Sequence, residues 1–467
     1  MTGKNLIPLF LASLLTAPAA HATVDLIALG SVSGTYEDLA TDTADPLENG
    51  VAGNSLGGLG SGLAYAGGNT FVAVPDRGPN AKSYDSAVDD TTSYINRFQT
   101  FSLSLAPNPS YDQTQSSSLP FTLTPFLLKT TLLWNKKPLV YGTGAGLGVG
   151  SGVPALNTKH TNYFTGRSDN FDPTQPSTNP SNARFDSEGI RVSKDGQSVF
   201  ISDEYGPYVY QFDRATGERI NVFALPQEFA VTNLNPMGAA EISGNTSGRL
   251  ANKGMEGLAI TPDGGTLVGI MQAPLIQDGG KTGGKTVRIV TIDIHTGTTH
   301  QYAYTLTAGS GVSEIVAVND HEFLVDERDG KGLGDNSTAA VKQLYHIDLS
   351  GAQEVMSGDT GSAIAGKAVG KTLFLDIVAV LTAHGTGKKD IPAKIEGVAF
   401  GQDVVIDGMT KHTLYVTNDN DFVATVTDSN HPTGIDNPNK FFVFAFDGTD
   451  LPGFVPQQIK SINVCAP

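Results

Sequence analysis

The sequence has little cysteine and little positive charge. Cys465 is the only cysteine, so no internal disulfide can form. Lys and Arg number 30 against 47 Asp and Glu, which gives a net charge of −17. Such a chain has no basic excess with which to displace counterions from a nucleic acid, and we expect no nucleic-acid partner. Hydrophobic residues make up 39% of the chain, which excludes a disordered acidic protein.

Long apolar runs are absent after the N-terminus. Residues 6–15 form an apolar run that follows Lys4 and precedes Ala20-His21-Ala22, which is the pattern of a cleaved signal peptide. The run is too short to span a bilayer. We therefore predict a signal peptide at residues 1–22, a domain at 23–467 without a membrane span, and a secreted or periplasmic location. An uncleaved membrane anchor is the alternative.

Sustained helical periodicity is also scarce, whereas strand patterns recur along the whole chain. Short segments rich in β-branched and aromatic residues are bounded by Gly, Asp, Asn or Pro, as strands are. They lie at 70–74, 198–202, 266–271, 288–294, 322–326, 413–417 and 440–446. Polar, Gly- or Pro-rich stretches predict long loops at 40–56, 105–119, 142–183 and 328–340. The pattern indicates an all-β protein.

A repeat organises these strands. Four segments place a glutamate before an apolar strand, FDSEGIRV, KGMEGLAI, GVSEIVAV and AKIEGVAF, and a fifth, GLGSGLAY, has Ser61 there. Each is followed by a second strand that ends in a polar cluster, and in three units the offset is 15 residues. The glutamates are spaced by 58 to 82 residues, enough for one four-stranded propeller blade.

The repeat predicts a β-propeller that forms a single closed domain. Five units are recognised, and room between about 100 and 180 for a degenerate unit favours six blades. A seven-bladed ring remains open as an alternative. We expect the runs at 24–29 and 441–446 to complete one blade together, because this closes the ring without an exposed edge.

Blade geometry brings the repeated acidic residues to one channel mouth. The first strand of a blade lines the channel, so its start and the end of the second strand share a rim. Oxygen ligands favour Ca²⁺ or another hard divalent cation, and no Cys/His cluster suggests zinc. A solvated acidic surface is the alternative. The predicted metal ligands are Asp76, Glu188, Asp203, Glu256, Glu314, Asp326, Glu327, Glu396, Asn418 and Asp419.

Several ordered motifs resemble a known family. FDSEGIRVSKDGQSVFISDEYGPYVYQFD, NKGMEGLAITPDG, VSEIVAVNDHEFLVDERD and KIEGVAF followed by LYVTNDNDF are similar to the bacterial "esterase-like activity of phytase" family, over roughly 25–455. The resemblance implies an exported propeller whose repeated acidic residues serve phosphoester hydrolysis. The positions that match by motif are Asp186, Glu188, Asp203, Glu204, Glu256, Glu314, Asp326, Glu327, Glu396, Asn418 and Asp419. Ser61 and Met271-Gln272 depart from the repeated pattern.

These observations lead to the hypothesis of a metal-dependent phosphoester hydrolase. A metal would bind the substrate phosphate, a carboxylate would act as general base, and Arg or Lys would neutralise charge. The candidate catalytic residues are Glu188, Glu256, Glu396, Asp203, Glu204, Arg77 and Lys253. We expect a small phosphorylated substrate and a monomeric protein. A non-catalytic binding module with a structural metal and, by analogy of fold, a lactonase-type hydrolase remain alternatives.

Overall fold

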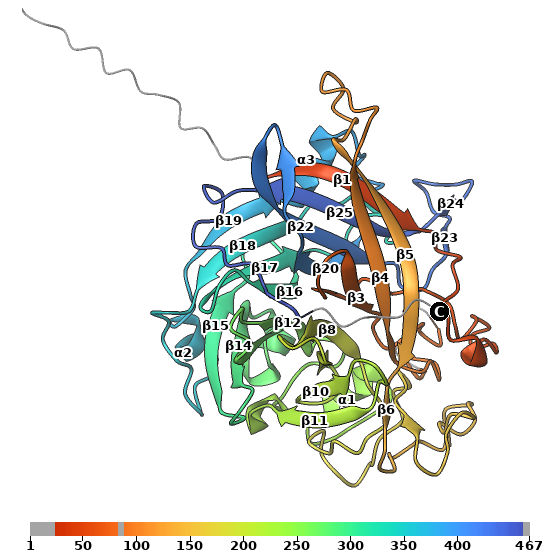
Figure 1. Ribbon diagram of the computed structural model, residues 1–467. Coiled ribbons are helices and arrows are strands. Elements are labelled where there is room, and N and C mark those ends of the chain that lie inside the picture. Colours follow the sequence, from red (N-terminus) through yellow and green to blue (C-terminus); the bar gives the residue numbers. More distant parts are fainter. Residues whose placement is uncertain (1–23, 83–87, 461–467) are drawn as a thin grey trace, which may run out of the picture.

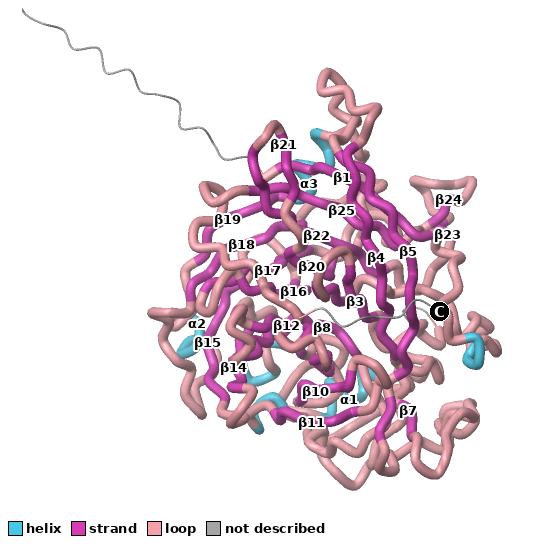
Figure 2. The backbone as a smooth tube through the Cα atoms, viewed as in Figure 1, coloured by secondary structure: helices cyan, strands magenta, loops and turns pink. Residues whose placement is uncertain are grey.

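The computed structural model describes residues 24–82 and 88–460, so the predicted signal peptide and Cys465 lie outside the described residues. Strands make up most of the regular structure, and the helices are short and scattered among the loops (Figure 2). Within the described ranges, no helix has the length and apolar character needed to cross a bilayer.

Five antiparallel sheets of four principal strands radiate from a common centre as the blades of a propeller (Figure 1). Blade 1 contains β2 (Gly62–Tyr65), β3 (Thr70–Val74), β4 (Arg97–Pro107) and β5 (Phe121–Leu132). Blade 2 contains β8 (Ser187–Val192), β9 (Ser198–Asp203), β10 (Tyr208–Asp213) and β11 (Arg219–Ala224). Blade 3 contains β12 (Met255–Ile260), β13 (Thr266–Met271), β14 (Thr286–Asp293) and β15 (Thr299–Thr305). Blade 4 contains β16 (Gly311–Ala317), β17 (Glu322–Arg328), β18 (Lys342–Asp348) and β19 (Lys371–Asp376).

Blade 5 joins the two ends of the described chain. It contains β20 (Lys394–Phe400), β22 (Met409–Asp419), β25 (Asn439–Phe446) and β1 (Asp25–Val32), and β21 (Val404–Ile406) pairs with β22 outside this path. β1 runs antiparallel to β25, with Asp25 opposite Ala445 and Val32 opposite Asn439. The prediction that the N- and C-terminal runs complete one blade together is therefore confirmed (Figure 1).

Short elements lie in the connections between blade strands. The minor strands are β6 (Trp134–Asn135), β7 (Asn162–Tyr163), β23 (Thr425–Val426) and β24 (Ile435–Asp436). The α-helices are α1 (Gly238–Gly244), α2 (Ser362–Ala365) and α3 (Ile377–Ala383). The 3₁₀ turns are η1 (Thr41–Thr43), η2 (Gln227–Phe229), η3 (Ile276–Asp278) and η4 (Gly280–Thr282).

The innermost strands form the wall of the central channel. β2, β8, β12, β16 and β20 contact one another in this order, and β20 contacts β2. The glycine after the repeated glutamate permits this close approach. A Cβ atom on Gly189 would lie 2.6 Å from the backbone nitrogen of Leu258, and one on Gly257 would lie 2.7 Å from that of Ile315. The repeated Glu-Gly pair thus has a packing role as well as a chemical one.

The predicted six blades are wrong: among the described residues the strands form five. The segment between about 100 and 180 supplies no sheet of its own. Its first part extends β4 to Pro107 and, after a hairpin, forms β5, so it completes the blade that Ser61 begins. The following residues to 184 form loops and the two-residue pair of β6 with β7. The length of this segment favoured a sixth unit, but the chain uses it for the long β4–β5 hairpin and for loops.

Arg191 of β8 fills the channel below the ends at which the inner strands begin. Its Nη1 donates to the carbonyl oxygen of Leu63 at 2.8 Å, and its Nη2 donates to that of Ile315 at 2.8 Å. Nη2 also lies 3.1 Å from the carboxylate of Glu314. The corresponding position of the other four inner strands is alanine, which leaves room for the guanidinium; these residues are Ala64, Ala259, Ala317 and Ala399.

The C-terminal segment lies at the far end of the same channel. The backbone N–H of Val455 donates to the carbonyl of Val318 at 2.8 Å, and that of Lys460 donates to the carbonyl of Lys194 at 3.2 Å. Gln457 lies between them and lines a small cavity beside Arg191. The C-terminal segment therefore covers this end of the channel, and the large cavity lies at the end where the inner strands begin.

Candidate metal centre

A cavity of about 770 Å³ lies at the open end of the channel, where the inner strands begin. Its size is in the range of small-molecule sites. Four cationic side chains line it: Arg77, Lys253, Arg328 and Lys394. Eight carboxylates line it as well: Asp76, Glu188, Glu204, Glu256, Asp335, Glu396, Asp419 and Asp421. The predicted convergence of acidic residues from successive blades is thus present for Asp76, Glu188, Glu256, Glu396 and Asp419.

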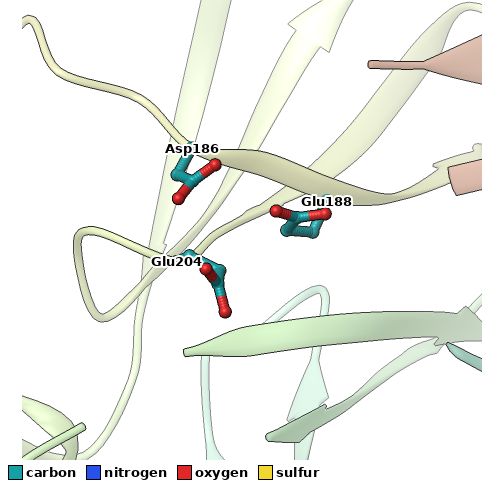
Figure 3. Close-up of side chains that lie close together, drawn as sticks. All are labelled: Asp186, Glu188 and Glu204. Carbon is teal, nitrogen blue, oxygen red and sulfur yellow. The ribbon is translucent and has the colours of Figure 1, made fainter. Parts of the chain in front are cut away.

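Three carboxylates of blade 2 form a compact group, here called the acidic triad: Asp186, Glu188 and Glu204. Asp186 directly precedes β8, Glu188 is its second residue, and Glu204 directly follows β9. The pairing of Ser187 with Asp203 across the two strands brings these positions together. One carboxylate oxygen of each residue lies within 4.8 Å of those of the other two, and the three side chains face a common space (Figure 3).

The spacing of the acidic triad fits a hard divalent cation. Ca²⁺ binds oxygen at about 2.4 Å, so two oxygens that share the ion lie at most about 4.8 Å apart. All three side chains are buried, with residue exposures of 0% for Asp186, 5% for Glu188 and 2% for Glu204. The donor set contains only carboxylate oxygens, which suits Ca²⁺ or Mg²⁺ rather than zinc.

The electrostatics of the triad point the same way. Burial and the carboxyl of Glu256 raise the pKa of Glu188 well above its ordinary value. Burial, together with the carboxyls of Glu256 and Asp186, also raises the pKa of Glu204 well above its ordinary value. Arg77 is the one cation that pairs with the triad in the described chain, at 3.0 Å from Asp186. A divalent cation would neutralise the remaining carboxylates and hold them ionised.

The other cations of the cavity pair with carboxylates outside the triad. Nη2 of Arg328 donates to Glu396 and lies 3.7 Å from Glu256. Nζ of Lys394 lies 2.7 Å from Asp419 and also contacts Asp421. None of these pairs involves the triad, whose ion-pair partner in the described chain is Arg77.

Lys253 and Gln272 complete the polar wall of the cavity. Lys253 is exposed and has no ion-pair partner among the described residues, so its ammonium group is available to an anionic ligand. Gln272 stands where other blades carry an acid, and its Nε2 donates to Glu256 at 2.7 Å. The amide thereby supplies a donor where another carboxylate would add repulsion.

Five of the predicted ligands lie outside the cavity lining: Asp203, Glu314, Asp326, Glu327 and Asn418. Glu314 pairs with Arg191 in the channel. Glu327 accepts from the backbone N–H groups at positions 307–309 and lies 2.6 Å from Nζ of Lys371, so it anchors a loop. Asn418 accepts from the backbone N–H of Lys440 at 2.7 Å.

Asp203 lies directly behind the triad and contacts its backbone. Its Oδ1 accepts from the N–H of Asp186 at 3.2 Å and from the N–H of Tyr205 at 2.9 Å. These two groups flank the triad, because Tyr205 follows Glu204. Asp203 is therefore placed to fix the orientation of two triad members without touching the cavity.

Replacing Asp203 should weaken metal binding. Asp203→Ala removes both backbone contacts, and we expect about a 10- to 100-fold loss of Ca²⁺ affinity, as for other groups that orient ligands. Asp203→Asn keeps an oxygen at the same place and should stay within a few-fold of the wild type. Calorimetric titration with Ca²⁺ measures both, and melting in chelator checks the fold. Wild-type affinity in Asp203→Ala would refute the role.

Two buried carboxyls away from the triad make stability depend on pH. Burial raises the pKa of Glu314 to about 7 and that of Asp326 to about 8. Both oxygens of Asp326 are buried without a hydrogen-bond partner. Each group binds its proton more tightly in the folded state than in the unfolded state, so its contribution is complete below about pH 4 and is lost as the pH rises to about 8.

The free energy of unfolding in chelator should therefore fall between about pH 5 and pH 8. The slope is about 1.4 kcal/mol per pH unit for each group that titrates in the folded state alone. Denaturant titrations at several pH values measure it. Asp326→Asn cannot titrate, so its decline should be shallower; an unchanged slope in this variant would exclude Asp326 as a source.

Four acidic residues of the site were not among the predicted ligands. Glu204 was predicted as a catalytic residue and not as a ligand. Asp186 was matched only through the family resemblance, since the repeat itself begins at Glu188. Asp421 belongs to the polar cluster after β22, and its neighbours at 418 and 419 were chosen instead. Asp335 lies in the Gly-rich stretch 328–340, which was predicted as a loop and carries no repeat signal.

Solved structures resemble this chain only distantly. A PQQ-bound aldose sugar dehydrogenase of Streptomyces coelicolor is 12% identical, with a TM-score of 0.32, and the match covers 92% of this chain and 100% of that chain. A putative 6-phosphogluconolactonase of Bacteroides uniformis is 14% identical, with a TM-score of 0.28, and the match covers 82% and 88% of the two chains. Likenesses at this level support no inference about chemistry.

Sequence comparison gives a closer relationship. An uncharacterized secreted protein of Arthroderma benhamiae is 31% identical over 198 residues, which cover 35% of this chain and 38% of the relative. A family profile named Phytase-like, described as "Esterase-like activity of phytase", matches residues 54–422. This range holds the acidic triad and almost all of the cavity wall. The chain belongs to the Phytase-like family.

Proposed function

We propose that this protein is an exported, metal-dependent hydrolase of small phosphoesters. The observation that carries the proposal is the acidic triad, three buried carboxylates with the spacing of a divalent-cation site, of which Glu188 and Glu204 line the cavity of about 770 Å³. The family and the description of a relative as secreted agree with it. A phosphorylated small molecule is the proposed substrate, and the proposed active form is a monomer.

Different residues of the cavity have different proposed roles in metal binding, substrate binding and charge neutralisation. Asp186, Glu188 and Glu204 would hold a Ca²⁺-type cation, which when bound supplies positive charge for phosphoryl oxygens and acidifies bound water. Lys253 at the cavity wall binds the anionic group of the substrate through its free ammonium. Arg328 is placed to neutralise charge that develops during the reaction.

Glu256 is the proposed general base. Burial raises its pKa above the ordinary value of a glutamate, which brings its proton affinity closer to neutral pH. Its carboxylate lines the cavity beside the triad, and the amide of Gln272 orients it from 2.7 Å. Among the cavity carboxylates it combines proximity to the triad with a fixed orientation.

A substrate panel tests the proposal. Hydrolysis of phytate, p-nitrophenyl phosphate and bis-(p-nitrophenyl) phosphate is followed with Ca²⁺ and with a chelator. We expect turnover of at least one phosphoester with Ca²⁺ and its loss with chelator. Ca²⁺ binding without any turnover would favour a binding module, and hydrolysis of lactones alone would favour the lactonase alternative.

A further inference from the structure

One sector of the cavity wall is apolar. Four small or aliphatic side chains line it: Val312, Leu333, Ala393 and Val423. Val312 is the second residue of β16, and Leu333 lies in the loop after β17, so both belong to blade 4. Ala393 precedes β20 and Val423 follows β22, so both belong to blade 5. Leu333 and Ala393 stand at the junction of blades 4 and 5. Val312 borders blade 3, because its N–H donates to the carbonyl of Gln272 at 3.1 Å. The four residues are here called the apolar wall.

Backbone pairing holds the apolar wall in place. The N–H of Leu333 donates to the carbonyl of Ile391 at 2.8 Å, and the N–H of Ala393 donates to the carbonyl of Leu333 at 3.0 Å. Leu333 and Ala393 are buried, with exposures of 5% and 8%, while Val423 is 41% exposed. The wall is thus a fixed surface with one accessible side chain.

The apolar wall lies across the cavity from the acidic triad. The inner strands contact one another in the order of blades 1 to 5, and blade 5 contacts blade 1. In a ring of five, the junction between blades 4 and 5 is opposite blade 2. Blade 2 carries all three triad residues. A ligand that spans the cavity would touch the triad at one end and the apolar wall at the other.

The charge of the cavity disfavours a highly anionic ligand. Eight carboxylates face four cations, and three of these cations already pair with carboxylates. A polyphosphate needs several cations that are not already paired, and this cavity does not supply them. Among the four cations that line the cavity, Lys253 alone has no ion-pair partner in the described chain.

We infer that the site selects esters with a single anionic group and an apolar arm. The anionic group lies toward the triad and Lys253, and the arm packs on Leu333 and Val423. A phosphodiester or phosphomonoester with an aryl or alkyl arm has this chemistry, and a polyphosphorylated polyol does not. This inference rests on the proposed function, because it assigns the substrate class of the same site.

Binding measurements test the inference without requiring turnover. Diphenyl phosphate and inositol hexakisphosphate are titrated calorimetrically into the protein at the same fixed free Ca²⁺ concentration. We expect diphenyl phosphate to bind at least tenfold more tightly. Equal or tighter binding of inositol hexakisphosphate would overturn the inference. An absence of hydrolysis would refute only the proposed function, because the order of affinities does not depend on catalysis.

A matched pair of variants locates the apolar arm. Val423→Asp places a charge on the exposed residue of the wall and should weaken diphenyl phosphate binding at least tenfold while leaving Ca²⁺ affinity unchanged. The control is Val405→Asp, since Val405 is 65% exposed and lies on β21 outside the cavity. Wild-type affinity in Val423→Asp, or an equal loss in both variants, would overturn the placement.

Discussion

Glu188→Gln should weaken Ca²⁺ binding by about 100-fold or more and abolish metal-dependent hydrolysis. Groups that merely orient a metal ligand already contribute about 10- to 100-fold, so loss of a ligand charge should exceed that range. Glu188 belongs to the acidic triad, is 5% exposed, and has a carboxylate oxygen within 4.8 Å of those of Asp186 and Glu204. The amide keeps the size of the side chain and removes only its charge.

The same substitution should raise stability when no metal is present. Burial and like charges raise the pKa of Glu188, so an ionised carboxylate there destabilises the metal-free fold at neutral pH. We expect Glu188→Gln to melt above the wild type in chelator at pH 8 and below it with saturating Ca²⁺. A variant that binds Ca²⁺ as the wild type does would remove the triad as the metal centre.

The matched control is Glu218→Gln. Glu218 belongs to the same blade and lies in the turn between β10 and β11, at the opposite end of the sheet from the cavity. Its replacement should leave Ca²⁺ affinity, hydrolysis and the melting temperature in chelator unchanged. A comparable loss in both variants would indicate a general effect of charge rather than a site.

Arg191→Ala should destabilise the protein by about 3–5 kcal/mol, the range measured when one partner of a buried ion pair is removed. Arg191 is 3% exposed, and its guanidinium reaches carbonyl groups of three other inner strands as well as Glu314. Removing it leaves the carboxylate of Glu314 buried without its cation. Denaturant titration at pH 8, where Glu314 is ionised, gives the largest expected difference.

A double variant separates the ion pair from the lost packing. Arg191→Ala with Glu314→Gln removes the unpaired charge, so it should regain part of the loss and show less dependence on pH than Arg191→Ala alone. The loss of stability that remains in the double variant measures the effect of the space left by the Arg191 side chain and of the carbonyl groups left without a donor. Unchanged stability in Arg191→Ala would show that the contacts of Arg191 do not stabilise the channel.

The repeat predicted the architecture because the same physical requirement recurs in each blade. A glutamate at the channel mouth and a glycine against the next inner strand are needed at the same place, and both are visible in the sequence. The predicted number of blades was wrong because of a part of the chain in which the repeat gives no signal. β4 and β5 are outer strands that need neither residue, so the chain between about 100 and 180 had room for a further unit and no signal against one.

The site was predicted in part for the same reason. The repeat correctly predicted that Glu188, Glu256 and Glu396 lie at the channel mouth. Glu314 occupies the equivalent position of blade 4, but its side chain points into the channel toward Arg191. Its Oε1 accepts from the N–H groups of Leu258 and Ile315, which the repeat cannot reveal. Arg191 occupies the position at which the four other repeat units carry alanine, so its role in the channel can be read from the sequence.

The pairing of β1 with β25 sets an order for biosynthesis. Asp25 meets Ala445, so the ring has no closed form until nearly the whole chain has left the ribosome. Until then β1 and the edge of β22 that pairs with β25 keep unpaired backbone groups, which are templates for association with other chains. Chains that end before β25 should therefore associate with one another instead of folding into a closed ring. Pairing of the last strand thus distinguishes complete chains from truncated ones.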